Sequence, residues 1–304
     1  MILYQLHIMW YETNMIDECW HSVLQALRAA KGVDVKLEIC FNAQTYVEEP
    51  TSGIDPIKLF DKWDSHPLVQ DYNPNITIKT NDDPFYNIAD WRRDIYDPSA
   101  DYTLWGETDT IIPRDTFLIL DQLAKSKALP DKHVLTFAGR PMYDNSWDIV
   151  THPQFLGYSK PCQCGDTHRD DCLELLEEPW KYKDYIDQKT LDAFNEEQGN
   201  VEIVGLPDLK IDGSTVCISG NHEMPFIAPG MNFVREDTCF EQVCRIKKIP
   251  QFLVKNRLKG HNYWHPNKRS GTDATRNDDV FKQYANVSAH EMNSFLYELA
   301  RTTS

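Results

Sequence analysis

The sequence contains no apolar run that approaches the roughly 20 residues a membrane-spanning helix needs. Its first residues lack the charged start and long apolar stretch of a signal peptide, so we expect a cytoplasmic protein. Neither an internal repeat nor a low-complexity tract is present, which argues against a solenoid or a disordered chain. Basic residues are scarce, because 31 Lys and Arg stand against 47 Asp and Glu, for a net charge of −16. This balance argues against a general DNA-binding protein, but it leaves room for a local basic groove.

The 304 residues, 41% of them hydrophobic, are enough for one large domain or two small ones with a real core. There are eight cysteines. In a cytoplasmic protein we expect these to be thiols or metal ligands rather than disulfides.

The beginning of the chain shows the pattern of a parallel α/β unit. Residues 2–9 form a nearly continuous apolar run, which is typical of a buried parallel strand. Apolar residues at three- and four-residue steps from Ile16 to Leu27 predict a helix with one buried face, and residues 33–41 alternate like a second strand. A strand, a helix and a strand of these lengths predict a right-handed crossover in a parallel sheet.

The same patterns predict an α/β fold with a mainly parallel twisted sheet flanked by helices. We expect residues 1–270 to form one domain and residues 271–304 a C-terminal helical tail, with an irregular, Cys- and His-bearing insertion at about 143–200. Further strands are predicted at 75–79, in the stretch ending at Glu107, and at 133–138, 215–219 and 252–254; further helices are predicted at 57–63, 88–96, 115–127, 236–247 and 278–301.

The stretch Glu107-Thr108-Asp109 ends the predicted fourth strand with two acidic residues. Open α/β sheets bind ligands at the carboxyl ends of their strands, and a turn there lets neighbouring carboxylates converge on a divalent cation. The sequence thus indicates a place for a metal ion and a phosphate. A solvated acidic turn is the alternative reading of the same three residues.

Two later stretches carry groups of the same kind. Arg235-Glu236-Asp237 opens a predicted helix, where acids are favoured by the helix dipole and one carboxylate can act as a general base. His261 and His265 follow in Gly260-His261-Asn262-Tyr263-Trp264-His265, and a histidine here can complete a metal shell. Ordinary helix-start acids and loop histidines are the alternatives.

In this order the three stretches resemble the motifs of GT-A glycosyltransferases, and within them the family 2-like enzymes. The resemblance covers most of residues 1–268. It implies a nucleotide-sugar donor, expected to be UDP-linked, and a Mn²⁺ or Mg²⁺ ion held by Asp109, Glu107 and His261. It also implies that Asp237, with Glu236 beside it, is the catalytic base, as in the inverting members of the family. The enzyme would then be a hexosyl- or pentosyltransferase.

Two positions depart from the family pattern. Glu107 replaces the usual first Asp, so Asp109 is the expected metal ligand and Glu107 is placed near the ribose or a metal-bound water. At the end of the second strand, Cys40-Phe41-Asn42-Ala43-Gln44 replaces an acidic pair, with Asn42 as the substitute contact to the nucleobase. The expected donor-binding residues are Trp10, Tyr11, Glu12, Asn42, Arg92, Arg93, Glu107 and Thr108.

Roles for several of these follow from their chemistry. Tyr11 can stack on the nucleobase and Glu12 can accept a hydrogen bond from a ring N–H, whereas Arg92 or Arg93 can grip phosphate oxygens in a fork. Packing in a core or loop is the alternative for the first two, and a solvated helix face is the alternative for the arginines.

A separate cluster lies in the predicted insertion. Cys162, Cys164, His168 and Cys172 fall within eleven residues, and they supply the four ligands of a tetrahedral structural Zn²⁺ site. Such a site would fix the insertion without taking part in the chemistry. Unliganded surface thiols or a disulfide are the alternatives, because the spacing departs from Cys-x2-Cys.

The strings around Asn81–Arg93 and Leu258–Tyr263 resemble those of glycosyltransferases encoded by large tailed phages. This implies action in a host cytoplasm on the hydroxymethyl group of a modified pyrimidine such as 5-hydroxymethylcytosine in phage DNA. A surface glycan or lipid-linked saccharide, and a non-enzymatic zinc-stabilised binding module, are the alternatives. One basic stretch predicts either a DNA groove or a solvated face; it contains Lys247, Lys248, Lys255, Arg257, Lys259, Lys268 and Arg269.

Overall fold

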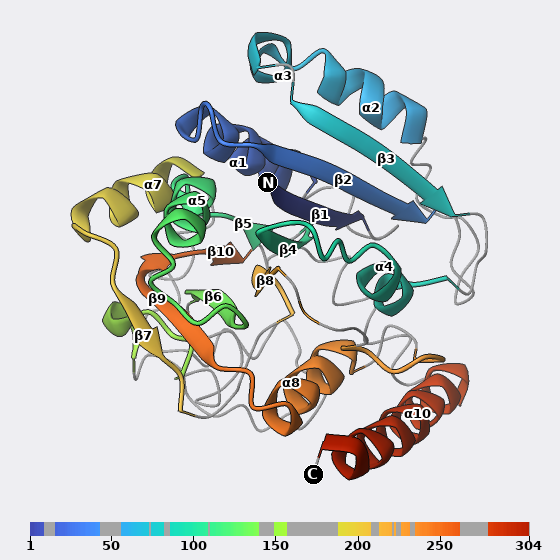
Figure 1. The fold of residues 1–304 in the computed structure, drawn as a ribbon. Coiled ribbons are helices and arrows are strands. Elements are labelled where there is room, and N and C mark those ends of the chain that lie inside the picture. Colours follow the sequence, from blue (N-terminus) through green and yellow to red (C-terminus); the bar gives the residue numbers. More distant parts are fainter. Residues whose placement is uncertain are drawn as a thin grey trace.

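The computed structural model has a twisted sheet of eight strands at its centre (Figure 1). The structure describes residues 1–8, 16–42, 56–72, 74–81, 86–108, 110–139, 149–156, 188–207, 213–220, 222, 226–231, 235–261 and 279–303. The strands of the large sheet are β1 (Ile2–Ile8), β2 (Val35–Asn42), β3 (Asn75–Asn81), β4 (Tyr102–Glu107), β6 (Val134–Ala138), β7 (Ile203–Gly205), β8 (Val216–Ser219) and β9 (Gln251–Leu258).

Helices lie on both faces of this sheet (Figure 1). They are α1 (Ile16–Ala29), α2 (Pro56–Asp64), α3 (Pro67–Tyr72), α4 (Ile88–Asp94), α5 (Thr116–Ser126), α7 (Gln188–Glu197), α8 (Glu236–Ile246) and α10 (Asp279–Thr303), with a short 3₁₀ turn, η2 (Pro153–Phe155). The predicted α/β class, with a mainly parallel sheet flanked by helices, is confirmed.

The strand order is β3-β2-β1-β4-β8-β6-β9-β7. The chain steps outward from β1 to β2 and β3 through parallel neighbours, then returns to place β4 on the other side of β1, again in parallel. The point between β1 and β4 is therefore a topological switch point, where open α/β sheets bind their ligands. Strands β8 and β7 run antiparallel to their neighbours.

Side-chain alternation along β1 separates two cores. Tyr4, Leu6 and Ile8 face one hydrophobic cluster together with residues of α1 and α5. The second cluster lies on the other side, between the sheet, α8 and α10, and includes Trp105 and Phe240. All seven residues of β1 are buried because helices cover both of its faces, as the continuous apolar run predicts.

A small second sheet joins two segments that are far apart in the sequence. Strand β5 (Thr110–Ile111) pairs antiparallel with β10 (Gly260–His261), and His261 lies opposite Thr110. This pairing places the residue after Asp109 beside the backbone of His261.

The structure differs from the sequence prediction in several places. Part of the segment 143–200, predicted to be irregular, forms the helix α7, whose Leu191 and Phe194 are buried against Leu258. The short elements α3, β5, β7 and β10 were not predicted, because their apolar patterns cover too few residues to show a period. The cysteines that the structure describes are buried thiols outside any disulfide, as expected; they are Cys19, Cys40, Cys217, Cys239 and Cys244.

The C-terminal helix α10 packs on α8 (Figure 1). Its buried Met292 joins the second core, and Phe295, Leu296 and Leu299 pack against the same cluster. Within the part of the chain that the structure describes, no helix combines the length and apolarity required to cross a bilayer.

The contact between α10 and α8 gives a test of the fold. Met292 is 7% exposed, so Met292→Ala should lower the free energy of unfolding by about 2 kcal/mol or more, measured by urea denaturation. Val287 on the same helix is 43% exposed, and Val287→Ala should change it by less than about 0.5 kcal/mol. Equal effects of the two substitutions would contradict this packing.

Candidate functional site

The carboxyl ends of β1 and β4 lie side by side at the switch point. In their parallel register His7 of β1 is opposite Glu107, the last residue of β4. Glu107 is 20% exposed at its side chain, and Thr108 after it is buried. Both sit where the sequence predicts ligand contacts.

The helix α8 brings two more carboxylates to this place. Arg235, with a φ of 68°, takes the left-handed conformation just before the helix, and Glu236 and Asp237 occupy its first turn. Acidic side chains in the first turn interact favourably with the helix dipole.

Arg92 of α4 links the end of β4 to the start of α8. Its Nη1 donates to Glu236 Oε1 at 2.9 Å, and its Nη2 donates to Glu107 Oε1 at 2.6 Å and to the carbonyl oxygen of Gly213 at 2.8 Å. The guanidinium also lies 4.9 Å from the centre of the Trp105 ring. Its side chain is 0% exposed, so this is a buried, multiply paired cation.

Asp237 belongs to the same group. A Cβ atom added to Gly213 would lie 3.0 Å from Glu107 Oε1, 3.5 Å from Arg92 Nη1 and 3.6 Å from Asp237 Cβ. These three side chains therefore surround one glycine. Asp237 Oδ1 accepts a hydrogen bond from the N–H of Thr238 at 2.6 Å, which fixes its orientation.

The surroundings raise the pKa values of both acids at the start of α8, Glu236 and Asp237. Burial, reinforced by neighbouring Asp237 and Glu107, raises the pKa of Glu236 to about 8, although Arg92 opposes the rise. Burial also raises the pKa of Asp237, against the N–H of Thr238 and the charge of Arg92. Carboxylates with raised pKa values are suited to accepting a proton near neutral pH.

The expected metal ligands fall partly outside the described residues. The structure does not describe Asp109, and of His261 it describes the backbone alone. The pairing of β5 with β10 nevertheless places His261 opposite the residue that follows Asp109. A carboxylate and an imidazole are suitable ligands for a divalent ion such as Mn²⁺, so the residue types suit one.

The two arginines have partners within the protein. The full burial of Arg92 does not fit the expected grip on phosphate oxygens, because its guanidinium faces protein acids instead. Arg93 pairs with Asp90 and Asp94 on its own helix, at 2.6 and 3.1 Å.

The remaining expected contacts lie outside the described residues. For Asn42 the structure gives only the backbone, as the last residue of β2. The others are the nucleobase contacts Trp10, Tyr11 and Glu12 and the zinc ligands Cys162, Cys164, His168 and Cys172.

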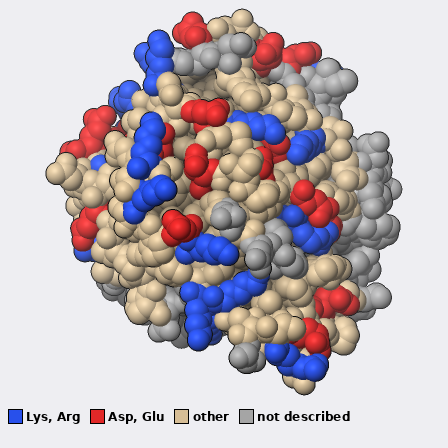
Figure 2. Space-filling model, viewed as in Figure 1, with Lys and Arg blue, Asp and Glu red and all other residues tan. Residues whose placement is uncertain are grey.

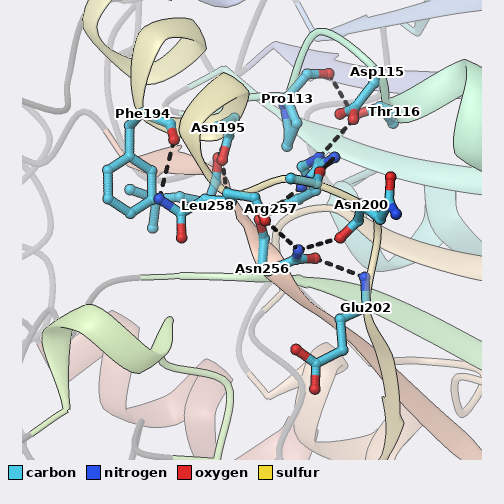
Figure 3. A network of polar contacts seen from close by, with 12 residues as sticks. Pro113, Asp115, Thr116, Phe194, Asn195, Asn200, Glu202, Asn256, Arg257 and Leu258 are labelled. Carbon is cyan, nitrogen blue, oxygen red and sulfur yellow. Dashed lines mark hydrogen bonds and ion pairs between the residues drawn. The ribbon is translucent and has the colours of Figure 1, made fainter.

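Among the described residues of the basic stretch, two of the cations are buried rather than exposed. Arg257 is buried, with its Nε 2.6 Å from Asp115 Oδ2 (Figure 3). Lys259 is 0% exposed, and its Nζ donates to the carbonyl oxygen of Ser214 at 2.7 Å. On the face drawn in Figure 2, acidic and basic side chains are interspersed. Lys268 and Arg269 lie outside the described residues.

Two residues near the site, Gly213 and His7, were not predicted from the sequence. Gly213 follows Asp212, and Asp-Gly is a turn signal that could have marked this segment as a tight connection before β8. His7 is a polar residue inside an apolar strand, 2% exposed, and neither ring nitrogen has a hydrogen-bond partner among the described residues. Burial, with the charge of Arg92, lowers the pKa of His7, so its imidazole stays neutral.

No protein-family model matches the sequence, and no curated protein matches it. Among solved structures, residues 1–349 of TarS from S. aureus align with 48% of this chain and 39% of that chain, at 10% identity and a TM-score of 0.34. The same TarS fragment in complex with UDP-GlcNAc aligns with 48% of this chain and 38% of that chain, at 10% identity and a TM-score of 0.34.

A protein from Desulfovibrio desulfuricans G20, described as a nucleotide-diphospho-sugar transferase, aligns with 45% of this chain and 58% of that chain, at 11% identity and a TM-score of 0.26. The chain thus spans less than two thirds of each of these proteins. At these TM-scores the likeness does not establish a family.

The raised pKa of Glu236 predicts a dependence of stability on pH. The pKa rises from an ordinary value of 4.5 to about 8, so between these values the folded protein holds a proton that the unfolded chain has released. The free energy of unfolding should therefore fall as the pH rises through this window. Glu236→Gln should flatten the fall in urea denaturation series, whereas Glu202→Gln at the surface should leave it unchanged. A steep fall retained in Glu236→Gln would assign it to another group.

Proposed function

We propose that this chain is a metal-dependent glycosyltransferase, which moves a sugar from a nucleotide-sugar donor, expected to be UDP-linked, to a hydroxyl acceptor. The observation that carries the proposal is the meeting of Glu107, Glu236 and Asp237 beside the switch point of an α/β sheet. Ligands bind at this place in such sheets. Carboxylates whose pKa is raised, as for Glu236 and Asp237, are suited to proton transfer.

Asp237 is the proposed base. It takes the proton of the acceptor hydroxyl while the acceptor oxygen forms its bond to the sugar and the nucleoside diphosphate leaves. The raised pKa of its carboxylate favours this transfer near neutral pH. Glu236 is held by Arg92 through Oε1, so we assign it the supporting role and leave Asp237 to meet the acceptor.

Asp109 and His261 are the proposed ligands of a Mn²⁺ or Mg²⁺ ion. When bound, such an ion stabilises the negative charge that develops on the diphosphate. Arg92 engages Oε1 of Glu107, which favours Asp109 as the carboxylate ligand. For the donor itself, Trp10, Tyr11, Glu12 and Asn42 remain the proposed contacts to the nucleobase.

The proposed acceptor is the hydroxymethyl group of 5-hydroxymethylcytosine in DNA, as the phage resemblance implies. The burial of Arg257 and Lys259 removes two cations from the expected groove, so contact with DNA would depend on the other basic residues. A surface saccharide is the second acceptor to compare.

The test measures nucleotide release and sugar transfer with Mn²⁺ and a panel of nucleotide sugars, with and without hydroxymethylated DNA or oligosaccharides. We expect Asp237→Asn to lower kcat by roughly 10²- to 10⁴-fold, because it removes the base. Glu241→Gln is the matched control: it lies on the same helix, where it pairs with Arg245, and should keep normal turnover.

Asp109→Asn and His261→Ala should also weaken Mn²⁺ binding, measured directly by titration calorimetry. Failure of the wild-type protein to turn over or bind any donor would contradict the proposal and favour a non-enzymatic binding module. Turnover only with oligosaccharides would exclude the DNA acceptor.

We also propose that Cys162, Cys164, His168 and Cys172 hold a structural Zn²⁺ ion. The purified protein should then contain about one equivalent of zinc, as expected for a closed tetrahedral site, and Cys164→Ser should lose it. Metal analysis of both proteins tests this. Less than about half an equivalent in the wild-type protein would contradict it.

A further inference from the structure

Arg92 occupies a fixed position beneath the candidate site. The helix α4 that carries it is short, but its start is closed by a reciprocal pair of hydrogen bonds: the Asn87 side chain accepts from Ala89, and the Asp90 side chain accepts from Asn87. From β1, Gln5 Nε2 donates to the carbonyl oxygen of Trp91 at 3.2 Å. The backbone next to Arg92 is therefore held from two sides.

The guanidinium connects three separate segments. Its partners are Glu107 at the end of β4, Glu236 at the start of α8, and the carbonyl oxygen of Gly213 before β8. A guanidinium presents several N–H donors in one rigid plane, whereas a lysine ammonium is a point charge on a flexible stem. Only arginine can hold these partners in one geometry from this position.

The charges explain why this geometry depends on Arg92. The charges of Asp237 and Glu107 raise the pKa of Glu236, the charge of Glu107 also raises the pKa of Asp237, and Arg92 acts against both rises. Without the cation, carboxylates in a buried place either separate or take up protons. The acids pack closely around Gly213. There is no room for a side chain at this position, because a Cβ there would already be 3.0 Å from Glu107 Oε1.

We propose that Arg92 is the positioning residue of this site, resting on the glycosyltransferase function proposed above. It does not touch the donor or the acceptor. It sets the positions of Glu107 and Glu236, and through Glu236 the position of the adjacent Asp237 at the start of α8. Gly213 completes the arrangement because its missing side chain lets the acids approach the guanidinium.

The kinetic test compares Arg92→Met and Arg92→Lys with the wild-type protein. A base displaced by about 1 Å costs around 10²-fold in rate, so Arg92→Met should lower kcat by roughly that factor while the donor KM and the Kd for UDP with Mn²⁺ change less than about threefold. Arg92→Lys should recover only a small part of kcat, because it keeps the charge and loses the fork. Gly213→Ala should lower kcat without changing UDP binding.

Arg257→Met is the matched control. Arg257 is likewise buried and paired, with Asp115 and with the carbonyl oxygens of Gly199 and Asn256 (Figure 3). Its replacement should lower the melting temperature and keep kcat. A weaker Kd for UDP in Arg92→Met with kcat unchanged would overturn the proposal and make Arg92 a donor contact. Equal losses of kcat in Arg92→Met and Arg257→Met would reduce its role to stability.

A second measurement needs no activity. Arg92→Met leaves Glu236 buried without its cation, so the melting temperature should fall, and adding Glu236→Gln should restore part of it. Strictly additive losses would show that the two side chains are not coupled, which contradicts the positioning role. If the wild-type protein proves inactive with every donor, the proposed function fails, and this cycle still decides whether Arg92 holds Glu236. If Arg92→Met does not fold, Arg92→Lys and Gly213→Ala provide the kinetic comparison.

Discussion

One desolvated cation organises the centre of this protein. A guanidinium removed from water is tolerated only when carboxylates and carbonyl oxygens satisfy it, and Arg92 finds such partners on β4, on α8 and before β8. The end of β4 is more than about a hundred residues from the other two segments along the chain. The charge requirement therefore fixes how the second half of the chain closes over the carboxyl end of the strands formed by the first half.

The alternation along β1 allows a polar centre inside an otherwise apolar sheet. On one face Tyr4, Leu6 and Ile8 pack in the hydrophobic core. On the other face Gln5 holds α4 through the carbonyl oxygen of Trp91, and neutral His7 lies next to Glu107 in the neighbouring strand. The same strand thus supplies both apolar burial and the support for the charged group. Its carboxyl end is then the natural place for a ligand.

The sequence predicted the α/β class, the first four strands with the helices α1, α2 and α4, and the placement of Glu107 at a strand end, because these depend on apolar patterns along the chain. It did not predict α7 or the pairing of β5 with β10, since short elements are fixed by tertiary contacts rather than by local periodicity. The burial of Arg92 could not be predicted for a related reason. The spacing of the residues indicates that Arg92 lies on a helix. Whether its guanidinium faces solvent or buried acids depends on Glu107, Gly213 and Glu236, which come together only in the folded chain.

The link between β9 and β10 consists of a single residue, Lys259. Its N–H donates to the carbonyl oxygen of Ala138, and its buried ammonium donates to that of Ser214, so the link is held at both backbone and side chain. One residue inserted there would shift the pairing of His261 with Thr110 by a position and turn the strand over. A homologue of this chain should consequently preserve the number of residues between β9 and β10, even where surface connections differ in length.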